Sequence, residues 1–190
     1  MKAADPAPIP VRGASLWPLS VEAYHTLGEA GLISKRTELL YGLVYQKMSK
    51  SPFHSALVRR LVSLLQNVTM PGHFVSSEQP ITCIDSEPEP DVAVVVGNQT
   101  DFWEEHPHTA ELVIEVCVSS HEYDRSKLRA YATAGVKECW LILAPEKQVE
   151  VHRQPVDGAY ADTAVHGPGG RLSSSAVPAF VLDLGSFFSK

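Results

Sequence analysis

The fold and chemistry of this chain are decided by one stretch, in which residues 88–96 read PEPDVAVVV, residues 111–118 read ELVIEVCV and residues 119–127 read SSHEYDRSK. The first two runs are rich in Val and Ile, short, and bounded by Pro or polar clusters, which is typical of buried strands. Each predicted strand carries one acid, Asp91 in the first and Glu115 in the second. Burying a carboxylate costs several kcal/mol unless a positive group meets it, so both acids need partners.

If the two strands are neighbours in one sheet, Asp91 and Glu115 can face each other. Two carboxylates form an oxygen-only site, which suits a hard divalent cation such as Mg²⁺ or Mn²⁺. The backbone carbonyl of Val116 is expected to be a further metal ligand. Without a metal, the same acids would instead form structural salt bridges with Lys127 and Arg125.

Lys127 is predicted to reach this site from a helix over residues 121–134, which places several side chains on one face: Asp124, Lys127, Leu128 and Tyr131. A helix entered directly from the second strand returns its first turns to the neighbourhood of Glu115. The Lys127 ammonium can therefore reach a metal-bound phosphate. Asp124 is expected to anchor Lys127 or to approach the ligands of the metal.

These residues carry a resemblance. Pro90-Asp91, followed along the chain by a strand that bears Glu115, resembles the pattern of the PD-(D/E)XK nuclease superfamily. The sequence around Glu115, Asp124 and Lys127 is similar to that of the Uma-two family of restriction-endonuclease-like proteins. The resemblance extends from about Leu16 to Leu184. Its further matches are Glu38-Leu39-Leu40-Tyr41-Gly42, Met48-Ser49, His54 and residues 131–140.

The resemblance implies an α/β (α+β) fold with a restriction-endonuclease-like core, in which a mixed twisted sheet is flanked by helices and joined by additional antiparallel strands. It also implies a metal-dependent endonuclease that acts on nucleic acid, in particular DNA. It places Glu38 beside the metal and assigns His54 to the site. The superfamily pattern has a Lys two positions after the Glu, where this chain has Cys117. In Uma-two proteins a lysine of the following helix takes over, and Lys127 stands at that position.

Two other functions stay open at this point. Cys117 at the usual lysine position and an acidic composition favour an inactive nuclease-like scaffold that binds nucleic acid or a protein partner. Alternatively, Cys117 would be the nucleophile of a hydrolase with His54 or His121 as base, although a thiol close to Glu115 is poorly activated. His106 and His108, in a predicted loop over or beside the cleft, lack the helical spacing of many transition-metal sites.

Composition indicates one globular domain. The chain has 190 residues, 44% hydrophobic and 20% charged, a net charge of −6 and a pI near 5.7. We expect a single domain over residues 16–190 after a flexible arm at 1–15, with no membrane span or signal core, in the cytoplasm and as a homodimer. The three cysteines are unpaired in spacing and are predicted to be reduced, buried thiols. Nucleic-acid binders usually have a basic surface, so the acidity argues against tight DNA binding without a metal.

Other elements follow from periodicity and turn residues. A hairpin is predicted over residues 38–48 around Gly42, and helices are predicted to run from Ser20 to Glu29 and over 52–68. Further strands are predicted at 72–84, 138–143, 148–152 and 160–165. Residues 177–184, with Phe187 and Phe188, are expected to pack as an apolar tail.

Overall fold

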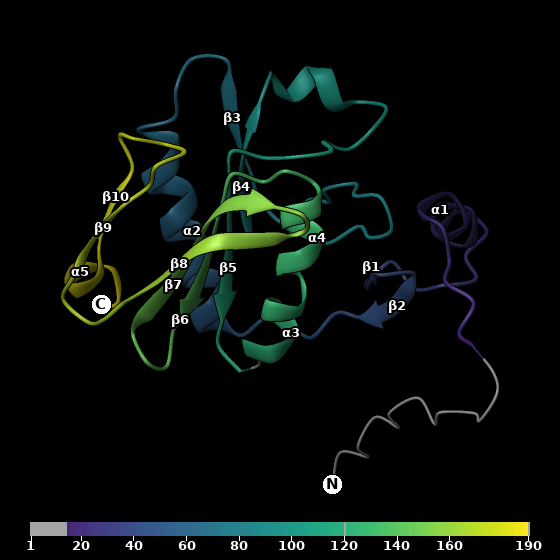
Figure 1. Cartoon of the computed structure of the whole chain (residues 1–190), viewed down its shortest axis with the longest axis horizontal. Coiled ribbons are helices and arrows are strands. Elements are labelled where there is room, and N and C mark those ends of the chain that lie inside the picture. The colour runs from purple at the N-terminus through teal and green to yellow at the C-terminus, as the bar shows by residue number, and fades with distance from the viewer. Residues whose placement is uncertain (1–14, 120, 190) are drawn as a thin grey trace, which may run out of the picture.

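The computed structural model describes residues 15–119 and 121–189, and at its centre lies a six-stranded sheet (Figure 1). Residues 1–14 of the predicted arm lie outside the described residues. In spatial order the strands are β3 (His73–Ser76), β4 (Val92–Val96), β5 (Leu112–Cys117), β6 (Glu138–Leu143), β7 (Gln148–Val156) and β8 (Ala159–His166). Neighbours are antiparallel except for β5 and β6, which are parallel. The predicted mixed sheet is confirmed.

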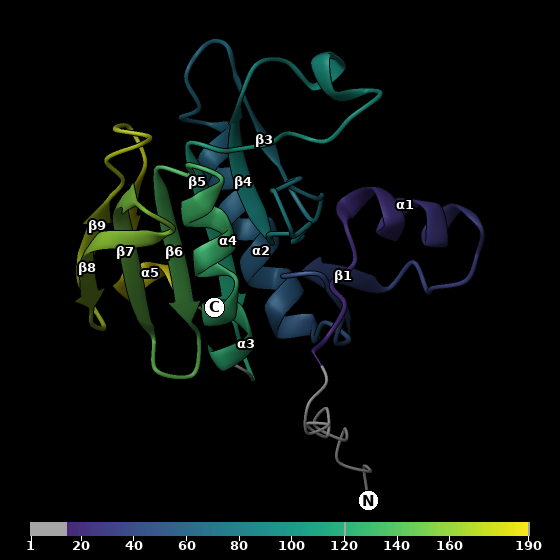
Figure 2. The ribbon, with the colours of Figure 1, turned by 45° about the vertical axis from the view of Figure 1, so that its right-hand side comes forward.

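Helices cover both faces of this sheet (Figure 2). On one face lies α2 (Pro52–Gln66), and on the other lie α3 (His121–Ser126) and α4 (Leu128–Thr133). Successive strand residues point to opposite faces, so β4 sends Val92 and Val94 into the core under α2 and sends Ala93 and Val95 into the core under α4. Strand parity therefore decides which side chains can meet the α3–α4 pair.

The remaining elements flank the sheet on two sides (Figure 1). On one side are α1 (Val21–Glu29) and the predicted hairpin, formed by β1 (Thr37–Leu40) and β2 (Leu43–Gln46). On the other are β9 (Arg171–Ser173), β10 (Val181–Asp183) and α5 (Leu184–Phe187), while a 3-10 turn, η1 (Gln99–Phe102), follows β4. The hairpin is joined to the segment before β4, because the Glu87 N–H donates to the Leu39 carbonyl at 2.7 Å.

The helix expected over 121–134 and the strand expected over 72–84 are wrong in extent. The helix expected over 121–134 is divided at Lys127, whose N–H donates to the Asp124 carbonyl three residues earlier at 3.2 Å, a tighter turn than an α-helix makes. The strand expected over 72–84 ends at Ser76. Glu78 adopts a positive φ of 56° and Pro80 has no N–H to donate, so the ladder cannot continue.

The apolar tail expected over 177–184 packs into the core through Val177, Phe180, Leu182 and Leu184, and its residues Val181–Asp183 form β10. Helix α2 ends at Gln66, just short of the predicted end. Cys83, Cys117 and Cys139 are buried free thiols, as predicted. No helix in the described ranges has both the length and the apolarity needed to cross a membrane.

Candidate active site

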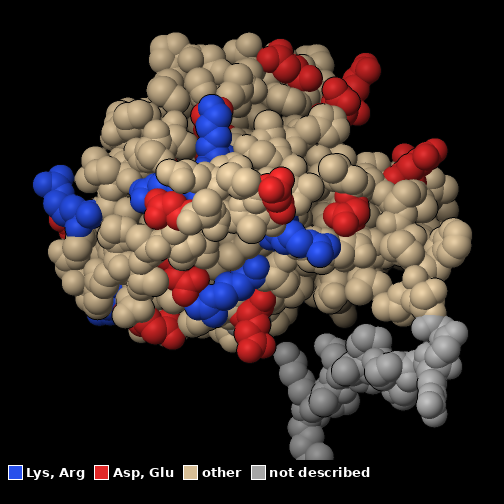
Figure 3. All heavy atoms as spheres, viewed as in Figure 1, with Lys and Arg blue, Asp and Glu red and all other residues tan. Residues whose placement is uncertain are grey.

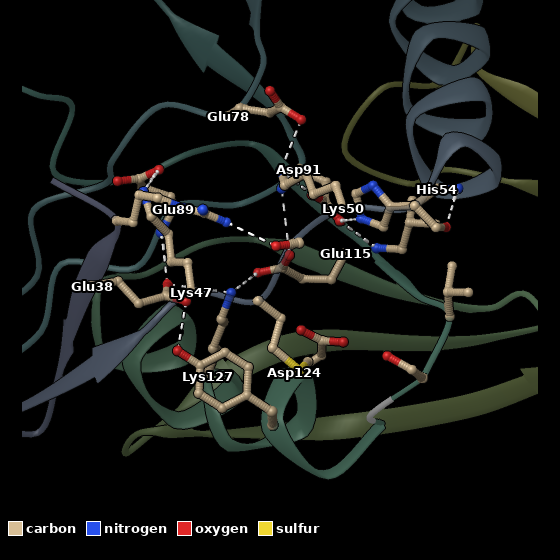
Figure 4. Close-up of a pocket in the computed structure, with 18 residues that line it drawn as sticks. Glu38, Lys47, Lys50, His54, Glu78, Glu89, Asp91, Glu115, Asp124 and Lys127 are labelled. Carbon is tan, nitrogen blue, oxygen red and sulfur yellow. Dashed lines mark hydrogen bonds and ion pairs between the residues drawn. The ribbon is translucent and has the colours of Figure 1, made fainter. Parts of the chain in front are cut away.

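A cavity of about 480 Å³ opens where the β1–β2 hairpin and the segment 47–51 meet the ends of β4 and β5 and the helix α3 (Figure 4). Its charged lining residues are Arg36, Glu38, Lys47, Lys50, Glu78, Glu89, Asp91, Glu115, Asp124 and Lys127. His54, Val116, Tyr123 and several serines complete the wall. Every residue that the sequence assigned to the site therefore lines this one cavity.

Asp91 and Glu115 converge because of sheet register. Strands β4 and β5 are antiparallel neighbours in which Val92 pairs with Ile114 and Ala93 with Val113, and extending that register by one residue sets Asp91 opposite Glu115. Parity then sends both side chains to the face covered by α3 and α4. The acids are 6% and 2% exposed. The prediction that two acids on neighbouring strands face each other is confirmed.

The Asp91 carboxylate is held by three donors. Its Oδ2 lies 3.0 Å from His54 Nε2 and accepts from the Val116 N–H at 2.8 Å, while its Oδ1 accepts from Lys50 Nζ at 3.0 Å. Burial alone would raise the pKa of Asp91, but His54, Lys50 and the Val116 N–H outweigh it and lower that pKa below its ordinary value. Asp91 is thus a charged group near neutral pH. His54 contacts it from the first turn of α2, where Ser51 Oγ caps the helix.

Glu115 has a different environment. Its Oε1 accepts from the Tyr131 hydroxyl at 2.6 Å and from Lys127 Nζ at 3.2 Å, and its Oε2 accepts a long bond of 3.4 Å from the Asp91 N–H. Burial raises the pKa of Glu115, and the charge of Asp91 adds to this rise, although Lys127 opposes it. Two neighbouring acids with pKa values shifted in opposite directions are typical of functional sites.

Lys127 links the two halves of the site. Its ammonium lies 3.2 Å from Glu115 Oε1 and 3.3 Å from Glu38 Oε2, and only 4% of the residue is exposed. Burial alone would lower the pKa of Lys127, but the two carboxylates hold it well above its ordinary value. Glu38 is fixed in turn, since it accepts from the Tyr123 hydroxyl at 2.6 Å and from the Glu89 N–H at 3.1 Å.

Asp124 does not supply the expected anchor for Lys127. Lys127 pairs instead with Glu38 and Glu115, and the Asp124 carboxylate contacts the Cys117 thiol. Burial raises the pKa of Asp124, only partly opposed by Lys127. Burial also raises the pKa of the Cys117 thiol, and Asp124 raises it further. This is the opposite of what a cysteine nucleophile requires, so the geometry argues against the hydrolase hypothesis.

Comparison with known proteins gives the family. A family model described as "Putative restriction endonuclease", Uma2, matches residues 21–185. The chain belongs to the Uma2 family. The resemblance inferred from the motifs is thereby confirmed.

A crystal structure from Anabaena variabilis ATCC 29413, described as "a putative nuclease belonging to DUF820", has the same fold as this Uma2 chain. The TM-score is 0.75 at 21% identity, over 90% of this chain and 98% of that one. Among curated proteins nothing matches.

The geometry shows which side chain supplies the positive charge beside Glu115. The side chain two positions after Glu115 belongs to Cys117, which is buried under α4 and carries no charge. The tight turn at Lys127 brings an ammonium to the same carboxylate from the neighbouring helices. In this Uma2 chain the positive charge beside Glu115 therefore comes from the α3–α4 junction, where the sequence had placed it.

The residues present fit a hard divalent ion. Six acidic side chains and four Lys or Arg side chains line the cavity, so its acidic groups outnumber its Lys and Arg side chains. Within residues 15–119 and 121–189 no group of three or more His, Cys, Asp or Glu side chains is arranged to hold a metal. Mg²⁺ is commonly held by one or two carboxylates with waters and substrate phosphates, which is the donor set that Asp91, Glu115 and the Val116 carbonyl would provide.

Sequence reasoning missed several neighbours of the two acids. The sequence predicts the helix face on which Tyr131 lies, but nothing in the sequence shows that the Tyr131 hydroxyl reaches Glu115. Nor does the sequence show that Lys50 pairs with Asp91. Arg125, a candidate partner of the acids, instead makes a two-bond contact with Glu150 on β7.

The loop after β4 lies apart from the active-site cavity. Together with His25 of α1, it lines a separate cavity of about 810 Å³ through Trp103, His106 and His108. The predicted loop is confirmed, but it does not contribute to the wall around Asp91 and Glu115.

Proposed function

We propose that this protein is a divalent-metal-dependent endonuclease that hydrolyses phosphodiester bonds in nucleic acid, with DNA as its substrate. The observation that carries the proposal is the convergence of Asp91, Glu115 and the buried Lys127 ammonium in one cavity. Membership of a family described as "Putative restriction endonuclease" supports this reaction class.

Each residue has a role that follows from its contacts. Asp91 and Glu115, with the Val116 carbonyl, would hold Mg²⁺ or Mn²⁺, and His54 with the Val116 N–H keeps Asp91 charged and oriented. When bound, such an ion supplies Lewis-acid stabilisation of the phosphate and lowers the pKa of water. Lys127 orients Glu115 and presents a fixed positive charge to the attacking water or to the charge that develops on the phosphate. Glu38 and Tyr123 hold that ammonium in place.

The surface charge favours recognition of a short length of backbone. The net charge is −6, and on the face in Figure 3 the basic side chains are interspersed with acidic ones. A continuous basic stripe usually supplies affinity for long duplexes. Here the cations that face a phosphate lie at the cavity, in Arg36, Lys47 and Lys50. A homodimer would supply two such sites, one for each strand of a duplex, so the proposal includes a homodimer.

The test compares three isosteric variants on plasmid and oligonucleotide DNA with Mg²⁺, Mn²⁺ or a chelator. Asp91→Asn and Glu115→Gln are expected to lower metal-dependent cleavage by about 100-fold or more, as removal of one electrostatic stabiliser does. Glu111→Gln is the control and should retain activity. Glu111 immediately precedes β5, and its carboxylate pairs with Lys137 outside the cavity. Circular dichroism confirms that all three fold. Cleavage that survives in folded Asp91→Asn, or in chelator, rejects the proposal.

A second candidate is a non-catalytic scaffold that binds nucleic acid or a protein. It is favoured by the observation that Lys50 and Lys127 already pair with Asp91 and Glu115. Calorimetry with Mn²⁺ separates the two candidates, because a scaffold has no reason to bind the ion at these acids.

A further inference from the structure

The hydrogen bonds at the two acids leave two oxygens for a metal. Asp91 Oδ2 already meets His54 Nε2 and the Val116 N–H, at 3.0 and 2.8 Å. Glu115 Oε1 already accepts from Tyr131 and Lys127, at 2.6 and 3.2 Å. Asp91 Oδ1 and Glu115 Oε2 are therefore the oxygens of the two acids that would remain to contact a hard cation.

One of these two oxygens already has a cation. Asp91 Oδ1 accepts from Lys50 Nζ at 3.0 Å, whereas Glu115 Oε2 has only the long contact of 3.4 Å from the Asp91 N–H. Figure 4 shows Lys50 and His54 on one side of Asp91, and Lys127 on the opposite side, next to Glu38. A divalent ion that approaches Asp91 Oδ1 therefore meets the Lys50 ammonium.

Lys50 differs from Lys127 in its freedom to move. Its side chain is 38% exposed, against 5% for Lys127, and it belongs to the segment between β2 and α2, outside any helix or strand. It also has a second partner, because Nζ lies 2.8 Å from Oε1 of Glu78, whose side chain is 47% exposed. Lys50 can therefore release Asp91 while it keeps an ion pair at the cavity entrance.

We propose that Lys50 is a built-in competitor of the metal, which occupies Asp91 Oδ1 and withdraws to Glu78 when a divalent ion binds. The inference rests on the proposed function, since it concerns the same two acids. After withdrawal the ammonium would remain paired with Glu78, whose exposed side chain lines the same cavity as Arg36 and Lys47. Lys50 thus sets the concentration of divalent ion that is needed to occupy the site.

The experiment is titration calorimetry of the full chain with MnCl₂ alone. Lys50→Met is expected to bind Mn²⁺ about 10-fold more tightly than the wild type, because the competing charge is gone. Lys50→Arg keeps the cation and should stay near the wild-type affinity. Lys47→Met is the matched control: it removes the same charge from the same cavity, but Lys47 pairs with Glu89 and not with Asp91. Lys50→Gln repeats the test if the Met variant does not fold.

The outcomes separate this inference from the proposed function. Tighter binding by Lys50→Met with little change in Lys47→Met supports the competition. Unchanged or weaker binding in Lys50→Met, or an equal gain in Lys47→Met, overturns it and leaves the proposed function standing. If neither the wild type nor any variant binds Mn²⁺, the proposed function fails and the inference fails with it.

Discussion

At the scale of single residues, the site depends on how buried charges are paired. Lys127 is a partner shared by Glu38 and Glu115, and all three side chains are at most 5% exposed. Removing one partner of a buried ion pair destabilises a protein more than replacing both partners by apolar residues does. The remaining charge is then buried without solvent or a partner. Lys127 is therefore needed for folding as well as for the proposed chemistry.

We predict that Lys127→Met lowers the free energy of unfolding by about 3 to 5 kcal/mol at pH 7, since it leaves two buried acids unpaired. Adding Glu38→Gln to that variant should recover part of the loss, because one of the two acids is then neutral. Urea denaturation of the wild type, both single variants and the double variant measures this coupling. Strictly additive losses would show that the two residues do not interact in solution.

Some of these residues were predictable from the sequence and others were not. Asp91 and Glu115 stand out because burying a carboxylate in a Val-rich strand carries a large desolvation cost. Side chains alternate between the two faces of a strand, which decides the face on which each acid lies. Lys127 follows from helical spacing. The contacts of Lys50 and Tyr131 depend on how a segment and a helix pack against the sheet, which no local pattern encodes.

At the scale of elements, the β1–β2 hairpin carries Glu38 into the site, and its turn has a strict requirement. Gly42 has a φ of +75°, and a Cβ added there would lie 2.3 Å from Pro18 Cβ and 2.8 Å from Pro18 Cα. A turn around Gly42 could be predicted because glycine allows a positive φ. The approach of Pro18 could not, since it joins residues far apart in the chain.

Gly42→Ala is expected to destabilise the protein by about 3 kcal/mol, because strain at a positive φ adds to a clash with backbone. Gly72→Ala is the control: Gly72 has a φ of +74° but open space around the added Cβ, so it should lose only about 1 kcal/mol. Chemical denaturation of both variants gives the comparison. Equal losses would mean that the contact with Pro18 carries no energetic weight.

At the scale of the whole molecule, one buried acid fastens the C-terminal segment to the sheet. Glu138, at the start of β6, accepts hydrogen bonds from the Trp140 indole, the Ser174 hydroxyl and the Ala176 N–H at 2.8, 2.8 and 3.0 Å. Arg153 of β7 pairs with the same carboxylate at 2.9 Å. The sequence placed Glu138 in a strand correctly, but its donors from residues 174–176 arrive through the packing of β9 and β10.

This network predicts how stability depends on pH. Burial alone would raise the pKa of Glu138, but the bonds from Trp140, Ala176 and Ser174 lower it below its ordinary value of 4.5. A carboxylate whose pKa is lower in the folded state contributes stability that is fully present above the unfolded pKa and is lost as pH falls through the folded pKa. The contribution of Glu138 should therefore hold at pH 7 and decline below about pH 5.

We predict that Glu138→Gln lowers the free energy of unfolding by about 2 kcal/mol at pH 7, because an amide cannot accept as strongly from so many donors. The gap between this variant and the wild type should narrow as pH falls from 5 to 3, since protonated Glu138 then resembles glutamine. Glu104→Gln, at an exposed loop position, should match the wild type throughout. Urea denaturation at each pH measures both differences. A gap for Glu138→Gln that stays constant down to pH 3 would mean that folding does not lower the pKa of this carboxyl group, and that its charge does not help to fasten the C-terminal segment.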